Sequence, residues 1–334
     1  MATGPTSPSR RGDDVARAAA TIRAGGVVAF PTETVYGLGA DAAVGHAVAR
    51  VFDIKGRPRA HPLIVHLAAG AELDGWARDI PDAARRLAAA AWPGPLTIVL
   101  ARGPRVADAA VGGADTVALR VPAHVVAQAL LAMLGGKVGI AAPSANRFGA
   151  VSPTTADHVA ADLGDDVDYL LDGGACEVGV ESTIVDLSRG RPVLLRPGGM
   201  PREAIEAIVG ALDAPDAAAP AAPGTLASHY APRAEVWAVE PDDVADRARE
   251  LAATGARVAV LAPRALLATR HMLPAVVTLA LPDDDAGMAR ELYAALRDLD
   301  GRGVDVIVAA LPPAAGLGEA VGDRLRRAGG SRPR

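Results

Sequence analysis

Short apolar runs alternate with amphipathic segments along this chain, which is the pattern of an α/β protein. Most of the apolar runs end at a proline, a glycine or a group of polar residues, so each is predicted to be a buried strand that leads into a loop. In the first two-thirds of the chain the predicted strands are residues 26–30, 63–67, 96–100, 116–122, 138–143, 181–187 and 193–198. The predicted helices are residues 13–24, 43–54 and 81–91.

A second set of alternating segments begins at Ala234 and predicts a smaller, doubly wound, Rossmann-like α/β domain. Its predicted strands are residues 235–239, 257–262, 276–279 and 304–309, and its helices are residues 241–253, 284–299 and 317–328. Residues 211–223 are rich in alanine, proline and aspartate, which is typical of a linker. We therefore expect a disordered stretch at 1–12, a first domain at 13–211, a linker at 212–233 and a second domain at 234–334.

The composition narrows the class of protein. At 334 residues, half of them hydrophobic, the chain can bury two cores. It has no apolar run long enough to cross a bilayer, and Arg10-Arg11 precedes Gly12-Asp13-Asp14 rather than an apolar segment, so we expect a cytoplasmic protein without membrane contact. The single cysteine, Cys176, excludes a disulfide framework and is expected to be a buried structural thiol.

Arginine greatly outnumbers lysine among the basic residues of this chain. Only Lys55 and Lys137 are lysines among 34 basic residues, and the net charge of −5 argues against a basic surface for nucleic acid, although a local basic groove would be hidden in that sum. The segment 55–62 contains Lys55, Arg57, Arg59 and His61 between glycines and prolines. It could bind a polyphosphate, or it could be an ordinary solvated loop.

Polar loops follow several of the predicted strands. Residues 31–41 contain threonines, a glutamate and a tyrosine together with Gly37 and Gly39, which we expect to let backbone N–H groups approach a ligand. Ser144 and Asn146 follow another strand. The segment 37–42 matches the dinucleotide pattern GxGxxA, but six residues separate its first glycine from the strand, so we do not expect NAD.

The segments taken together resemble the YrdC/Sua5 family of threonylcarbamoyl-adenylate synthases. The resemblance covers essentially the whole chain, and it is carried by Lys55-Gly56-Arg57 with Ser144-Ala145-Asn146 and by Gly224 to Pro232 of the two-domain Sua5 type. It implies a YrdC-like twisted, open, mixed sheet. It also implies a nucleotidyltransferase that uses L-threonine, bicarbonate and ATP with Mg²⁺ to make threonylcarbamoyl-AMP and pyrophosphate, for the modification of the tRNA adenosine next to the anticodon.

The family's functional residues can be placed on this chain. The resemblance implies that L-threonine is held by Thr34, His66, Arg120, Ser182 and the backbone of Ala142. It implies that ATP is held by Lys55, Arg57, His61, Thr116, Ser144, Asn146, Ser152 and Arg196, with Lys55 and Arg57 in the catalytic role. No side chain is implied as a metal ligand, because Mg²⁺ arrives on the phosphates of ATP.

Two further expectations concern partners and the linker. We expect the product to pass to the transferase that modifies tRNA, and an RNA-binding or ribosome-maturation module, with a weak contact to RNA, is the alternative from another class. Carbamoyl transfer is a second enzymatic alternative, although related domains of that kind carry cysteines that this chain lacks. His229 and Tyr230 follow a featureless linker, so we expect this segment to fold over the site as a lid, with Tyr230 on the phosphates, rather than only to pack between domains.

Overall fold

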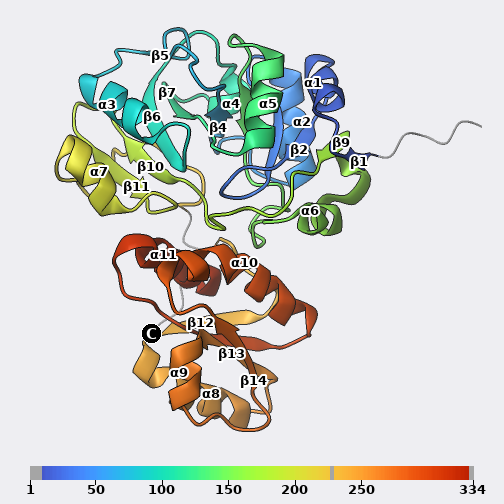
Figure 1. The fold of residues 1–334 in the computed structure, drawn as a ribbon, viewed down its shortest axis with the longest axis vertical. Coiled ribbons are helices and arrows are strands. Elements are labelled where there is room, and N and C mark those ends of the chain that lie inside the picture. Colours follow the sequence, from blue (N-terminus) through green and yellow to red (C-terminus); the bar gives the residue numbers. More distant parts are fainter. Residues whose placement is uncertain (1–9, 226–228, 331–334) are drawn as a thin grey trace, which may run out of the picture.

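The computed structural model describes residues 10–225 and 229–330, which form two α/β units, one above the other in Figure 1. The first unit contains an 11-stranded mixed sheet in the order β1-β9-β2-β3-β8-β4-β7-β6-β10-β11, with β5 paired to β6. The strands are β1 (Arg11–Gly12), β2 (Val28–Phe30), β3 (Gly37–Asp41), β4 (Ile64–His66), β5 (Ala77–Arg78), β6 (Leu96–Arg102), β7 (Thr116–Arg120), β8 (Ile140–Ala142), β9 (Tyr169–Leu171), β10 (Thr183–Asp186) and β11 (Val193–Arg196).

Helices cover both faces of this sheet and bury the side chains that alternate between the two faces. In β2, Val28 and Phe30 belong to one hydrophobic cluster and Ala29 to another, as expected when neighbouring residues of a strand point to opposite faces. The first cluster includes residues of α1 and α5, and the second includes residues of α2, α3, α4, α6 and α7. These helices are α1 (Val15–Arg23), α2 (Gly45–Lys55), α3 (Asp82–Ala91), α4 (Asp108–Val111), α5 (Val125–Leu134), α6 (Ala156–Leu163) and α7 (Arg202–Val209), and a 3₁₀ turn, η1, spans Gly164–Asp166.

The linker packs against the large sheet. Ala219 and Ala222 lie against a cluster of β4, β6, β7, β10 and β11 side chains that includes Ile64. Asp213 forms a bridge with Val193. Residues 213–222 are therefore packed against the sheet rather than being the featureless spacer that their composition predicts.

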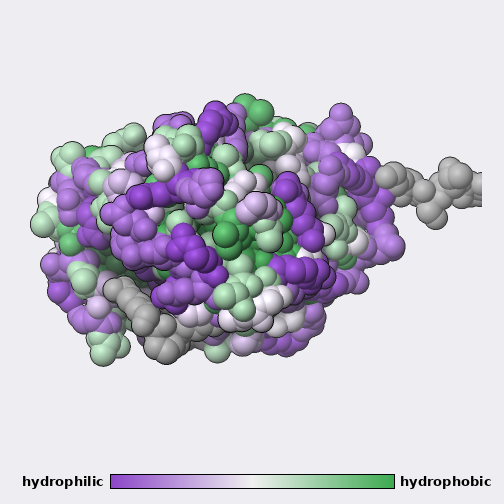
Figure 2. Space-filling model, turned by 90° about the horizontal axis from the view of Figure 1, so that it is seen from below, coloured by the Kyte–Doolittle hydropathy of each residue, from purple (hydrophilic) through white to green (hydrophobic). Residues whose placement is uncertain are grey.

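The second unit is a parallel sheet in the order β12-β15-β13-β14. Figure 1 shows α10 and α11 between this sheet and the first unit, with α8 and α9 on its other face. Its elements are β12 (Glu235–Val239), η2 (Pro241–Asp243), α8 (Val244–Ala253), β13 (Val258–Pro263), α9 (Arg264–Thr269), β14 (Val277–Leu281), α10 (Asp285–Gly301), β15 (Val306–Ala310) and α11 (Gly316–Gly329). Viewed from this end of the molecule, hydrophobic residues gather near the middle of the surface, with hydrophilic residues around them (Figure 2).

The predicted fold class is confirmed: a large mixed sheet is followed by a smaller, doubly wound parallel one. Two further local predictions differ from the structure. Residues 10–12 were expected to be disordered, but β1 pairs with β9; residues 1–9 lie outside the described part of the chain. The expected loop 31–41 ends in a strand, because residues 37–41 form β3, antiparallel to β2.

Candidate functional site

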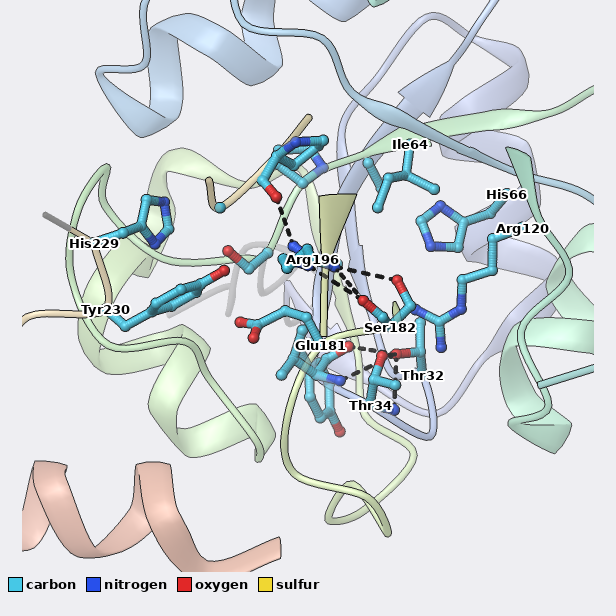
Figure 3. A pocket seen from close by; sticks show the side chains of 18 of the residues that line it. Thr32, Thr34, Ile64, His66, Arg120, Glu181, Ser182, Arg196, His229 and Tyr230 are labelled. Carbon is cyan, nitrogen blue, oxygen red and sulfur yellow. Dashed lines mark hydrogen bonds between the residues drawn. The ribbon is translucent and has the colours of Figure 1, made fainter. Parts of the chain in front are cut away.

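A pocket lies on the face of the large sheet that the linker crosses. Strands, the loops that precede β3 and β10, and the linker all contribute to its wall (Figure 3). The lining residues are Thr32, Thr34, Val35, Tyr36, Gly37, Arg57, Ile64, His66, Arg120, Ala142, Pro143, Ser144, Glu181, Ser182, Arg196, Pro223, Gly224, His229 and Tyr230.

Strand order brings the central part of the wall together. Ala142 of β8 is the register partner of Ile64 in β4, and His66 of β4 is the partner of Arg120 in β7. Ile64 and His66 point to the same face because they are two residues apart in one strand. Four side chains from three strands therefore form one continuous patch of the wall.

Small hydroxyl groups line another part of the pocket. The hydroxyl oxygen of Thr34 lies 2.8 Å from that of Thr32, and the hydroxyl of Ser182 lies 2.7 Å from that of Thr97. All four of these side chains are buried. In each pair one hydroxyl donates a hydrogen bond to the other, so the pocket presents hydroxyl groups in fixed positions that can bond a polar molecule.

Arg120 places a positive charge in the wall. Its side chain is buried, its Nη2 atom lies 2.8 Å from Oε1 of Glu33 in an ion pair, and its Nε donates to the carbonyl oxygen of Gly94 at 3.3 Å. The ion pair does not have hydrogen-bond geometry, and among the residues that the structure describes neither Glu33 oxygen has a hydrogen-bond partner. Arg120 is therefore held in position while part of its guanidinium group can still serve a bound carboxylate.

Arg57 and Arg196 are two further buried cations. Arg196 donates to the carbonyl oxygens of Ser182 (2.7 Å) and Pro223 (2.8 Å), and Arg57 donates to that of Pro62 (3.1 Å). Burial lowers the pKa of Arg57 to about 10 and lowers the pKa of Arg196 as well. Within residues 10–225 and 229–330, neither forms an ion pair with a carboxylate. Buried charge of this kind is costly unless it is compensated, so this part of the pocket favours an anion.

Two buried histidines are held in the neutral state. Burial, together with the charge of Arg120, lowers the pKa of His66 to about 3. Burial also lowers the pKa of His229 to about 3. The Nδ1 atom of each ring has no hydrogen-bond partner in the described structure. At neutral pH each imidazole can therefore act as a neutral donor or acceptor toward a ligand.

The linker closes the pocket on the side opposite His66 and Arg120 (Figure 3). Tyr230 is 1 % exposed, has a φ of +61°, and its hydroxyl has no hydrogen-bond partner in the described structure. Gly224 lies against this hydroxyl, since a Cβ atom built on it would be only 1.9 Å from the Tyr230 oxygen. Glycine is required there, because the φ of Gly224 is +76° and any side chain would collide with the tyrosine.

The sequence also matches known protein families. The model of a family described as "Telomere recombination", which groups Sua5, YciO and YrdC, matches residues 20–198, and the "Threonylcarbamoyl-AMP synthase, C-terminal domain" family matches residues 200–330. The chain belongs to the Sua5–YciO–YrdC family. The threonylcarbamoyl-AMP synthase of Pyrococcus abyssi is 45% identical over an alignment of 327 residues, which covers 94% of this chain and 94% of the relative. That of Bacillus subtilis is 40% identical over 95% of this chain and 93% of its own.

A solved member of this family has the same architecture. The crystal structure of P. abyssi Sua5 complexed with L-threonine superimposes with a TM-score of 0.87 at 42% sequence identity and covers 94% of each chain. Both units of the present structure are included in that match. The predicted family membership is therefore confirmed, and the RNA-binding alternative is not favoured.

All five residues predicted for L-threonine line the pocket, and they come from β4, β7, β8 and two loops. Four of the residues predicted for ATP, Arg57, Ser144, Arg196 and Tyr230, line it too. His61 lines an adjoining cavity that shares Arg57, Gly224 and His229 with the main pocket.

The other residues predicted for ATP do not line either cavity. Lys55 ends α2 and is 3% exposed, and its Nζ donates to the carbonyl oxygens of Ser144 and Asn146, both at 2.5 Å. Asn146 is buried as well and donates to the carbonyl oxygens of Arg147 and Ala150. Lys55 therefore supports the loop that carries Ser144, and the solvated-loop interpretation does not hold for this buried lysine.

Ser152 and Thr116 also lie elsewhere. Ser152 is fully buried and donates to Glu181 at 2.6 Å. Thr116 is the first residue of β7, and Arg120, which lines the pocket, is the last. Thr116 lies two residues before Ala118, the register partner of the pocket residue Ile64, so it is on the next rung of the sheet beyond the pocket.

Glu181 is a site residue that the sequence reasoning did not select. It lines the pocket and sits in the run Glu181-Ser182-Thr183, which was noted for Ser182 alone. A carboxylate directly before a buried strand was the available signal. Thr32, Pro223 and Gly224 are further lining residues that the site prediction did not include.

Gly37 and Gly39 serve packing more than ligand approach. Both lie in β3, and a Cβ atom on Gly39 would be 2.3 Å from a methyl group of Ile140 and 2.8 Å from the ring of Phe30. A Cβ on Gly37 would be 3.2 Å from the same ring, although Gly37 also lines the pocket. The expectation that both glycines admit a ligand is therefore wrong for Gly39.

Three remaining observations concern the described residues as a whole. Cys176 is a buried free thiol, as predicted, and burial raises its pKa to about 12. The described residues contain no group of three or more His, Cys, Asp or Glu side chains arranged to hold a metal ion. Across the same ranges, no helix combines the length and the apolar character needed to cross a membrane.

Proposed function

We propose that this chain makes threonylcarbamoyl-AMP and pyrophosphate from L-threonine, bicarbonate and ATP, and is thus a nucleotidyltransferase. The observation that carries the proposal is the convergence of Thr34, His66, Arg120, Ala142 and Ser182 on one pocket in a fold that matches L-threonine-bound P. abyssi Sua5. Relatives at 40% identity or more over nearly the whole chain bear the name of this synthase.

L-threonine would lie at the end of the pocket formed by β4, β7 and β8. Arg120 would hold its carboxylate, and the hydroxyls of Thr34 and Ser182 would hold its side-chain hydroxyl. His66 stays neutral, so it adds a hydrogen bond without adding a second positive charge. A site that bonds a hydroxyl group discriminates strongly against analogues that lack it.

ATP would occupy the opposite end. Arg57 and Arg196 supply the positive charge that a triphosphate needs, and Mg²⁺ would enter on the phosphates as part of the substrate. Phe148 lies between the rings of His61 (5.8 Å) and His229 (6.1 Å), measured between ring centroids, and forms an aromatic surface beside Arg57 on which an adenine could stack. The unpartnered hydroxyl of Tyr230 would donate to a phosphate oxygen.

The chemistry then needs positioning more than a nucleophilic side chain. The amino group of threonine attacks the carbon of bicarbonate, and water leaves to give N-carboxy-threonine. One oxygen of the new carboxylate attacks the α-phosphorus of ATP, the bond from that phosphorus to the bridging oxygen breaks, and pyrophosphate leaves. In-line transfer of this kind is accelerated by alignment and by neutralisation of charge on the phosphates.

The linker would protect the product. A mixed carboxylic–phosphoric anhydride hydrolyses readily, and Pro223, Gly224, His229 and Tyr230 form the wall that separates this end of the pocket from solvent. We further propose that the protein acts in the cytoplasm and that the adenylate passes to a transferase that modifies tRNA.

Pyrophosphate release tests the proposal. We expect release only when ATP, L-threonine and bicarbonate are all present, and we expect L-valine, which has a methyl group in place of the hydroxyl, to support less than a hundredth of the rate. Equal rates with L-threonine and L-valine would refute the substrate, and equal rates without bicarbonate would refute the reaction.

A further inference from the structure

A buried carboxylate in the pocket wall receives hydrogen bonds from both units of the protein. Oε1 of Glu181 accepts from the hydroxyl of Ser152 at 2.6 Å. Its Oε2 accepts from Nε of Arg324 at 2.7 Å and from the hydroxyl of Tyr293 at 2.8 Å. Tyr293 lies on α10 and Arg324 on α11, and both are fully buried. The second unit therefore provides the counter-charge for a residue of the catalytic pocket.

The same two side chains also hold Tyr230. The guanidinium carbon of Arg324 lies 4.9 Å from the centre of the Tyr230 ring, and the Tyr293 ring stacks on it with a centroid distance of 5.9 Å and an interplanar angle of 27°. The backbone on either side is fixed as well, because His229 N–H donates to the carbonyl of Arg327 and Ala231 N–H donates to that of Gly149. A tyrosine with positive φ is costly, so these contacts are what keep it in place.

We propose that Arg324 and Tyr293 are positioning residues of the active site: they neutralise Glu181 and hold Tyr230 so that its free hydroxyl meets the bound nucleotide. This inference rests on the proposed function and deepens it, because it assigns the C-terminal unit a part in building the nucleotide end of the pocket. Neither residue lines the pocket itself, and both act through Glu181 and Tyr230.

The position of these contacts predicts which substrate they affect. Tyr230 and Glu181 lie on the side of the pocket away from His66 and Arg120 (Figure 3). Burial raises the pKa of Glu181, whereas the charges of Arg324 and, to a smaller extent, Arg196 lower it, and the balance is a pKa of about 2. The carboxylate is therefore ionised at every ordinary pH and needs a cation beside it. Loss of Arg324 should therefore disturb nucleotide binding far more than L-threonine binding.

The test compares two arginines that join the units. Arg324→Met removes the guanidinium group from Glu181 and Tyr230, whereas Arg202→Met removes the ion pair between α7 and Glu319 of α11 (2.6 Å), which does not reach the pocket. Affinity for α,β-methylene-ATP with Mg²⁺ and for L-threonine would be measured by calorimetry, and the melting temperature of each variant by scanning calorimetry. We expect Arg324→Met to weaken nucleotide binding at least tenfold and L-threonine binding less than twofold, and Arg202→Met to change neither by more than twofold.

A double variant separates positioning from simple loss of stability. Glu181→Gln/Arg324→Met removes both partners of the ion pair and so leaves no unpaired charge at these two positions, and its melting temperature should return toward that of the parent. Its nucleotide affinity should stay at least fivefold weak, because Tyr230 still lacks the guanidinium group. Nucleotide affinity that recovers together with the melting temperature would overturn the proposal, as would equal affinities of Arg324→Met and Arg202→Met. The affinities are measured without turnover, so they test the positioning proposal independently of the reaction. If the parent protein binds the nucleotide but does not turn over L-threonine, only the proposed function is refuted.

Discussion

Nζ of Lys55 lies 2.5 Å from the carbonyl oxygen of Ser144, although 89 residues separate them in the chain. The ammonium group makes a second 2.5 Å hydrogen bond, to the carbonyl of Asn146, and so fixes the loop that carries Ser144 into the pocket. Burial is the main reason that the pKa of Lys55 is well below its ordinary value. The lysine therefore acts on the site through the backbone of this loop.

Lys55→Met should lower both stability and activity. Methionine retains the apolar stem but leaves two buried carbonyl oxygens without a donor, which costs on the order of 2–4 kcal/mol. Urea unfolding and pyrophosphate release would be measured on the same preparation, with Lys137→Met, the chain's other lysine, as the control. Full stability with loss of activity alone would show instead that Lys55 faces the phosphates.

Tyr230→Phe should weaken nucleotide binding without destabilising the folded protein. The hydroxyl has no hydrogen-bond partner in the described structure, so its removal should leave the melting temperature unchanged or slightly raised. Affinity for the nucleotide should fall about tenfold, as expected for the loss of one hydrogen bond to a charged group. A fall in melting temperature of several degrees without a change in affinity would assign Tyr230 to interdomain packing only.

Gly224→Ala tests the position of the Tyr230 hydroxyl by changing the residue that lies against it. The added methyl group would overlap the Tyr230 hydroxyl, and the φ of +76° is unfavourable for alanine, so the linker must move. We expect a loss of nucleotide affinity comparable with that of Tyr230→Phe. Gly210→Ala is the matched control, since its φ is also positive (+84°) but nothing lies within 4 Å of the added atom.

The buried histidines should make the fold sensitive to mild acid. His66 has a pKa of about 3 in the folded chain against an ordinary value of 6.5, so below pH 6.5 only the unfolded chain takes up the proton. Its contribution to stability is complete above pH 6.5 and declines by about 1.4 kcal/mol per pH unit as the pH falls toward 3. Glu181, with a pKa of about 2 against 4.5, adds a further decline between pH 4.5 and 2.

His66→Gln isolates this effect. Between pH 7 and pH 5 the parent should lose about 2 kcal/mol more unfolding free energy than the variant does, because the variant cannot take up this proton in the unfolded state. Urea unfolding at the two pH values measures the difference. His271→Gln, at an exposed position, should lose as much as the parent. Equal losses in the parent and His66→Gln would contradict a neutral, buried His66.

The sequence allowed the main features of the fold and half of the site to be predicted for a simple reason. Strands that bury both faces are continuous apolar runs, and the loops after them carry the polar groups, so His66, Arg120 and Ala142 could be placed at strand ends that the sheet order brings together. The resemblance to the family then identified which of these residues belong to one site.

The remaining features depend on contacts between distant segments. The direction of Lys55 is set by carbonyl groups of a loop about 90 residues away, and local sequence does not encode it. The need for glycine at Gly39 comes from Ile140 and Phe30 on neighbouring strands. Glu181 has its counter-charge on α11, more than 140 residues further along, so its role becomes visible only when the two units are seen together.

The identity of the product tests the central claim most directly. The protein would be incubated with MgATP, L-threonine and ¹³C-bicarbonate, and the adenylates formed would be identified by mass spectrometry before they hydrolyse. We expect a species that contains AMP, threonine and one bicarbonate carbon, and that becomes heavier by one neutron mass with the labelled bicarbonate. An adenylate of threonine without that carbon, or AMP and pyrophosphate with no threonine-containing adenylate, would contradict the account.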